Sequence, residues 1–199
     1  MIVDNEDITM PEESPFYNQL DEKWQSIYWG DDPRANFGFS GCGIFAFCNA
    51  VYALTGRLPD ALETAEWAIA TDAYATDGSG TYRKIFFSKV EAKYGKELGF
   101  TVRGQYKGKI TDRRLKNALM SGDTAIVHVP CHFLVLTGYD PEKDQYHVIE
   151  SNVSFMRFIR ADSWLSAAKL SRGNTRVDWY AILSRRHTDM HQNGQTEGR

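Results

Sequence analysis

The segment SGCGIFAFCNAVYALTG places a cysteine between two glycines at the start of a long apolar run. Residues 42 to 55 are apolar nearly all round a helical projection, which predicts a helix buried along its length, with Ser40 as N-cap and Gly56 at its C-terminal end. Glycine costs about 1 kcal/mol relative to alanine inside a helix. Two glycines at the entrance therefore indicate that another part of the chain comes close there.

Cys42 lies in the first turn of this predicted helix. A thiol in that position meets unpaired N–H groups and the positive end of the helix dipole, which favour the thiolate form. Cys42 is therefore a candidate nucleophile at the tip of a buried helix. The alternative interpretation is a small core residue, because free cysteines are often buried.

Helices are predicted early in the chain and strands late. Beyond the first helix, the apolar periodicity predicts helices at 60–70, 81–95 and 111–122 (the last with Thr111 as N-cap), strands at 123–129, 132–139, 145–151, 156–160 and 177–184, and a short helix at 162–170. The glycine-rich loop at 77–81 is interpreted as a linker between helices, with a mobile flap over a cleft as the alternative. This order predicts an α+β fold in which a helical half with a buried central helix packs on an antiparallel sheet.

The chain's 199 residues suit one domain, predicted over 1–184 with an irregular arm at 1–14 and a polar tail at 185–199. The net charge of −3 is spread without a basic stripe, so neither nucleic acid nor an anionic membrane is an expected partner. No apolar run has the length of a membrane span and no signal peptide is evident, so the expected location is cytoplasmic by default, or secreted if a leader has been removed. The three cysteines are an odd number without paired spacing and are expected to be free thiols.

A nucleophilic thiol needs a base, and five histidines are available. His187 and His191 lie in the polar tail, and His128 and His147 lie within predicted strands, where a structural role is the simpler interpretation. His132 begins a predicted strand, and residues at strand ends are well placed to line a cleft. It is the candidate base.

Three blocks, YNQLDEKW, SGCGIFAFCNAVYALTG and HFLVLTGYDPEKDQYHVIESN, occur in this order. Together they resemble papain-like cysteine peptidases, and more narrowly the stand-alone proteins similar to bacteriocin-processing peptidases that cleave after double-glycine leaders. In that family a Gln lies upstream of the Cys, Gly-Cys-Gly opens the central helix, and a His begins a strand that ends in Gly-Tyr-Asp. These positions correspond to Gln19, Cys42 and His132, within scattered blocks of residues 15–152. Two features depart from the pattern: Ile44-Phe45 follows where Pro-Thr or Pro-Ala is common, and no Asp-Pro supplies the third catalytic position.

The resemblance implies a papain-like fold and a hydrolase, a thiol protease that cleaves a peptide or amide bond in a peptide or protein substrate through a thioester. His132 would be the base, and an oxyanion hole would combine the Cys42 N–H with the Gln19 amide. No metal or cofactor is implied, and a zinc site is discounted because no Cys-x-x-Cys pair exists. The alternatives are an acyl transferase or amidase with the same Cys-His site, and a catalytically degenerate peptide-binding member. The sequence favours no cleavage site or oligomeric state.

The third member of the catalytic triad is predicted by counting along a hairpin. Five turn-forming residues, 140–144, separate two predicted strands, so Tyr139 is expected opposite Gln145. Counting outward places Asn152 directly across from His132, close enough for its amide to accept the imidazole N–H. The alternatives left open are Ser151, after a one-residue change of register, and Glu150, as a diagonal partner.

Overall fold

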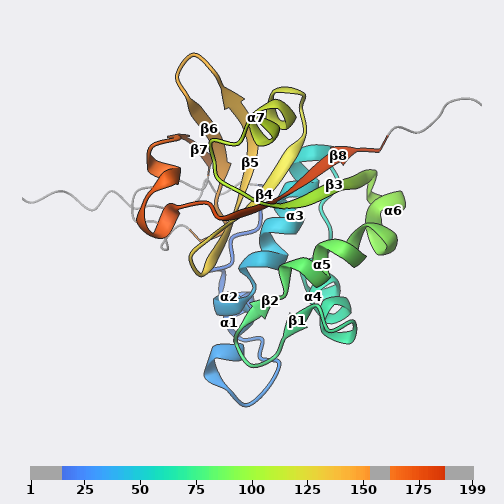
Figure 1. Ribbon diagram of the computed structural model, residues 1–199. Coiled ribbons are helices and arrows are strands. Elements are labelled where there is room, and N and C mark those ends of the chain that lie inside the picture. Colours follow the sequence, from blue (N-terminus) through green and yellow to red (C-terminus); the bar gives the residue numbers. More distant parts are fainter. Residues whose placement is uncertain (1–14, 153–161, 187–199) are drawn as a thin grey trace, which may run out of the picture.

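A six-stranded antiparallel sheet organises the part of the chain that the computed structural model describes, residues 15–152 and 162–186 (Figure 1). Its strand order is β3-β8-β4-β5-β6-β7. The strands are β3 (Phe100–Lys107), β4 (Thr124–Val129), β5 (His132–Asp140), β6 (Gln145–Ile149), β7 (Asp162–Ser166) and β8 (Trp179–Arg185). A separate small hairpin joins β1 (Tyr74–Ala75) to β2 (Gly80–Thr81).

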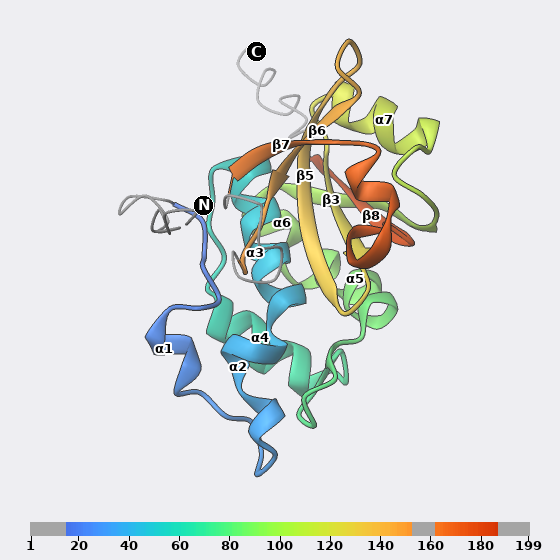
Figure 2. The same cartoon turned by 90° about the vertical axis from the view of Figure 1, so that its left-hand side faces the viewer.

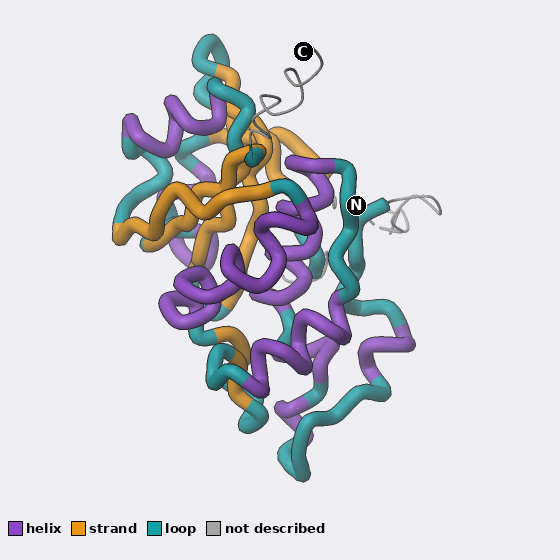
Figure 3. The backbone as a smooth tube through the Cα atoms, turned by 90° about the vertical axis from the view of Figure 1, so that its right-hand side faces the viewer, coloured by secondary structure: helices purple, strands orange, loops and turns teal. Residues whose placement is uncertain are grey.

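Helices lie on both sides of these strands, with α7 set apart from the others (Figure 3). They are α1 (Glu22–Gln25), α2 (Phe37–Ser40), α3 (Cys42–Thr55), α4 (Ala61–Ala70), α5 (Arg83–Val90), α6 (Lys96–Leu98) and α7 (Arg113–Met120). A π-helical turn, Glu91–Gly95, joins α5 to α6, and short 3₁₀ turns occur at Pro33–Ala35, Lys169–Ser171 and Gly173–Thr175. The α+β class predicted from the sequence is confirmed, as is the packing of a helical half on an antiparallel sheet.

The sheet separates two hydrophobic cores because successive side chains of a strand point to opposite faces. In β4, Ile126 packs with the helical half, whereas Ala125 and Val127 pack in the core that contains α7. In the view of Figure 2, α3 and α7 lie on different sides of the sheet. The sheet is thus covered on both faces, and α3 is the helix that runs along one of them.

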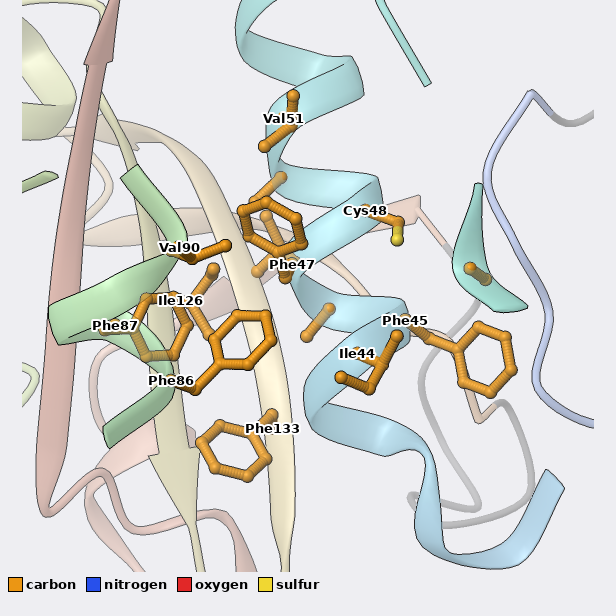
Figure 4. Close-up of a cluster of buried hydrophobic side chains, with 14 of the residues drawn as sticks. Ile44, Phe45, Phe47, Cys48, Val51, Phe86, Phe87, Val90, Ile126 and Phe133 are labelled. Atoms are coloured by element: carbon orange, nitrogen blue, oxygen red, sulfur yellow. The ribbon is translucent and has the colours of Figure 1, made fainter. Parts of the chain in front are cut away.

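Helix α3 is buried all round, as its sequence predicts. Figure 4 shows Phe47 directed towards Phe86 and Phe87, while Phe45 and Cys48 lie on the opposite side of α3. The Phe47 and Phe86 ring centroids are 5.2 Å apart. On the far side, Phe45 packs against Phe37 at 4.7 Å. Aromatic contacts on both sides hold the helix, and with it the cysteine at its first position.

The helix boundaries differ in part from prediction. Gly56 ends α3 in the left-handed conformation, as expected, and Asp60 caps α4 by accepting a hydrogen bond from the Glu63 N–H. Ser40 does not cap α3, because it belongs to α2, and its hydroxyl instead contacts the Asn36 carbonyl and Tyr74 Oη. The N-cap position of α7 is Asp112 rather than Thr111.

The predicted helix at 162–170 is wrong: residues Asp162–Ser166 form strand β7, the edge partner of β6. Leu165 is buried while Trp164 stacks against His147 on the other face, an alternation that fits a strand. The helix predicted at 81–95 begins later and runs on to Leu98, and β3 follows directly without having been predicted. The predicted strand at 156–160 lies outside the described residues. No helix in the described ranges is long and apolar enough to cross a membrane.

Candidate active site

Cys42 is the first residue of α3 and is half-buried. The N-cap position is Gly41, so no side chain caps the first turn of the helix. A Cβ atom at Gly43 would lie 2.5 Å from Thr81 Oγ1, and one at Gly80 would lie 2.6 Å from the Ser40 carbonyl oxygen. The close approach predicted from the two flanking glycines is therefore made in part by the β1–β2 hairpin, which contains the whole loop at 77–81 that was interpreted as a linker.

His132 lies at the start of β5 and is only 2% exposed. Its Nε2 is 2.6 Å from Glu150 Oε1, and the Cys42 side chain lies close enough to its ring to shift the pKa of the imidazole. Burial alone would lower the pKa of His132, but the hydrogen bonds to Cys42 and Glu150 outweigh burial and raise that pKa to about 10. The structure thus brings the two principal sequence candidates together, and the contacts of His132 favour its protonated form.

Glu150, rather than Asn152, supplies the oxygen that contacts His132 Nε2. The predicted hairpin register is wrong at its loop end, where Tyr139 pairs with Tyr146, but a bulge at Thr137 restores the predicted pairing further along. The ladder then stops at Val135 and Ile149, so the count cannot be extended to His132. The longer Glu150 side chain reaches diagonally, as the open alternative allowed.

Asn152 contributes its main chain to the same carboxylate, because its N–H donates to Glu150 Oε1 at 2.8 Å. Its side chain is half-buried and lines the same cleft as Cys42. Both residues at the end of the β6 segment therefore belong to the site, with Glu150 as the direct partner of the histidine.

Gln19 is fixed from two directions and is 1% exposed. Its Nε2 donates to the Gly38 carbonyl at 2.9 Å, and its Oε1 accepts a hydrogen bond from Ser151 Oγ at 3.0 Å. The Gln19 N–H also donates to the Ser151 carbonyl at 2.8 Å. Ser151 thus orients Gln19, and the residue before it, Glu150, positions His132.

A cleft of about 860 Å³ contains Cys42, His132, Gln19 and Asn152. Its walls come from α2, the β1–β2 hairpin, the start of α5 and the turn between β4 and β5. Another hollow, of about 620 Å³, is lined by no cysteine or histidine. The four residues selected from the sequence as catalytic therefore share one opening on the surface.

His128 also lines this cleft, although its place within a strand had favoured a structural role. Its Nδ1 is 2.7 Å from Asp178 Oδ1, and burial is the main cause that lowers its pKa. The sequence feature that could have identified His128 is its position near the end of β4. There it pairs with Phe133, the neighbour of His132, across the β4–β5 hairpin. His147 contacts Thr137 and Asp162 in the sheet, as a structural histidine does.

All three cysteines are free thiols. Cys48 is fully buried, which raises the pKa of its thiol, whereas Cys131 is exposed on the rim of the cleft. In the described part of the chain, no group of three or more His, Cys, Asp or Glu side chains is arranged to hold a metal ion.

No protein-family model matches the sequence, and no curated protein matches it either. Among solved structures, the chain is similar to the peptidase domain of Streptococcus ComA, described as a bi-functional ABC transporter involved in a quorum sensing pathway. The identity is 19% and the TM-score 0.49, over 82% of this chain and 99% of that one.

Proposed function

We propose that this chain is a cysteine peptidase that hydrolyses a peptide bond through a thioester, with Cys42 as nucleophile and His132 as base. The observation that carries the proposal is the burial of His132 between the Cys42 side chain and Glu150, at a cleft of about 860 Å³. A nucleophile, a base and a group that orients the base, all within hydrogen-bonding reach, form the arrangement required for covalent catalysis.

In the proposed reaction, the Cys42 sulfur attacks the scissile carbonyl and forms a tetrahedral oxyanion. Because Nε2 of His132 is held by Glu150, Nδ1 is the nitrogen left to exchange a proton with Cys42 and the leaving amine. The C–N bond breaks as the imidazolium protonates the amine, which leaves a thioester. His132, now neutral, takes a proton from water, which attacks the thioester and releases the acid and the thiol.

The oxyanion is proposed to meet the Cys42 N–H and the Gln19 amide. The Gln19 Nε2 has two hydrogens, and the Gly38 carbonyl occupies one of them. The second is available to the cleft that Gln19 lines. Since no side chain caps the first turn of α3, no capping group competes for the N–H groups there. Donors held in place before the reaction stabilise charge as it develops.

The finer proposal is a papain-like enzyme of the bacteriocin-processing type. It rests on the order of the three sequence blocks and on the correspondence of Gln19, Cys42 and His132 with that family's pattern. The acidic third residue, Glu150, comes from the geometry alone.

The experiment is hydrolysis of a diverse peptide library by the intact chain, read by mass spectrometry, with Cys42→Ala and His132→Ala as matched controls. We expect cleavage by the wild-type chain and none by either variant. An added amine acceptor distinguishes hydrolysis from transfer, because amide products would replace the free acid in a transferase. Cleavage that survives in Cys42→Ala would contradict the proposal.

A further inference from the structure

The cleft around Cys42 has a charge opposite to that of the chain. The protein has a net charge of −3, yet the residues lining this cleft include three arginine or lysine side chains and no aspartate or glutamate. The three are Arg34, Arg83 and Lys84. A cleft with charge of one sign attracts groups of the other sign.

Two of these cations have no ion-pair partner among the described residues. Arg34 pairs with Asp32 at 2.6 Å, so its charge is largely compensated. Within residues 15–152 and 162–186, neither Arg83 nor Lys84 forms an ion pair. The carboxylate of Asp178 pairs with His128 and does not line the cleft, so it does not serve as their counter-charge there. The first turn of α5 therefore presents two positive charges that lack a counter-charge.

The position of Arg83 is defined by the fold. Its guanidinium carbon lies 5.5 Å from the ring centroid of Trp179, a cation–π contact. Its charge also contributes, after burial, to the lowered pKa of His128, so its field reaches a residue inside the cleft.

Large apolar side chains stand beside these charges. Phe39 is 67% exposed, Tyr82 46% and Ile85 37%, and all three line the cleft. Phe39 belongs to α2, whereas Tyr82 and Ile85 flank the two cations at the start of α5. Exposed apolar groups gathered at one opening indicate a binding surface rather than scattered surface residues.

We propose that the substrate segment bound in this cleft has a carboxylate side chain next to a large apolar one, with Arg83 and Lys84 selecting the carboxylate. This inference rests on the proposed function and adds the class of peptide to it. The apolar side chain packs against Phe39, Tyr82 and Ile85, while the carboxylate supplies the counter-charge that α5 lacks.

The test compares matched peptides that differ at one position, Glu, Gln or Lys, scanned on either side of a bulky apolar residue. Binding to the Cys42→Ala variant is measured by fluorescence anisotropy, and kcat/KM is measured with the wild-type chain. We expect the Glu peptide to be preferred over the Gln peptide by about threefold to tenfold at low salt, with Lys the poorest. The preference should shrink as salt is added.

Variants assign the preference to its residues. In Arg83→Gln/Lys84→Gln the Glu-to-Gln ratio should fall towards one, whereas Arg113→Gln/Lys96→Gln, which removes two exposed cations outside the cleft, should leave it unchanged. Equal binding of the three peptides, or a preference that survives in the first double variant, would overturn the inference. Charge-selective binding without any turnover would overturn the proposed function and leave the inference standing.

Discussion

Glu150 is a carboxylate without exposure to solvent, and its role depends on what it contacts. Its side chain has 0% exposure. Oε1 contacts His132 Nε2 and accepts a hydrogen bond from the Asn152 N–H. A buried charge is tolerated when a partner and hydrogen bonds compensate it, and removing one partner leaves the other uncompensated. Glu150 therefore holds His132 in one orientation and favours its protonated form.

This geometry reverses the ranking that strand counting predicts for the third catalytic residue. We expect Glu150→Gln to lower kcat by at least about a hundredfold, because the amide keeps the side chain's shape but loses the charge that stabilises the imidazolium. Asn152→Ala should have a much smaller effect, since the N–H that contacts Glu150 belongs to the main chain. Steady-state kinetics with thermal melts of both variants make the comparison. A larger loss in Asn152→Ala at unchanged melting temperature would restore the original assignment.

Helix α3 is the element on which the site depends, because it positions Cys42 through its packing rather than through a cap. Its first turn has no capping side chain, and ten of its residues are buried against the sheet, α4 and α5. Most helical stability in proteins comes from such packing. We therefore expect the aromatic contacts of α3 to contribute more to stability than the exposed aromatic residues of the neighbouring cleft.

Two phenylalanines, one in the core and one in the cleft, allow the contributions of buried and exposed aromatic residues to stability to be compared. Phe47→Ala should lower the free energy of unfolding by about 3 to 5 kcal/mol, because it empties a fully buried site between Phe86 and Phe100. Phe39→Ala, the same substitution at an exposed site of α2, should change it by less than about 0.5 kcal/mol. Denaturant unfolding measures both. A similar decrease in the free energy of unfolding in the two variants would show that Phe47 is not part of the core around α3.

In the whole molecule, the site forms where the helical half meets the sheet. The central helix and the inner strands were predicted from the sequence better than the edge strands of the sheet. The buried helix, its cysteine and the later strands follow from periodicity, because side-chain spacing differs between helix and strand. Edge strands were missed or misassigned: β3 contains Gly104 at a bulge, and the partly exposed β7 has no continuous apolar pattern. Their conformation depends on the neighbouring strand more than on their own residues.

Candidate residues could be predicted where the residue type itself suggests the chemistry. They were harder to predict where the strand register determines which side chain reaches His132. Cys42 and His132 stand out by type and local context, and the structure brings them together. The choice of Glu150 depends on a bulge at Thr137 and on where the β5–β6 ladder ends, neither of which sequence spacing reveals. Arg83 and Lys84 reach the cleft only through the placement of α5.

We propose that His132 and Glu150 activate Cys42, and the rate at which iodoacetamide alkylates Cys42 as a function of pH tests this activation. Peptide mass mapping follows each thiol, with exposed Cys131 as the internal reference and buried Cys48 as the unreactive one. Because the pKa of His132 is raised to about 10, its imidazolium persists across pH 6 to 9 and keeps Cys42 reactive there. We predict that Cys42 reacts first in this range, and that His132→Ala slows it most at the acid end. Equal reactivity of Cys42 and Cys131, or a Cys42 rate unchanged by His132→Ala, would contradict the activation of Cys42 by His132.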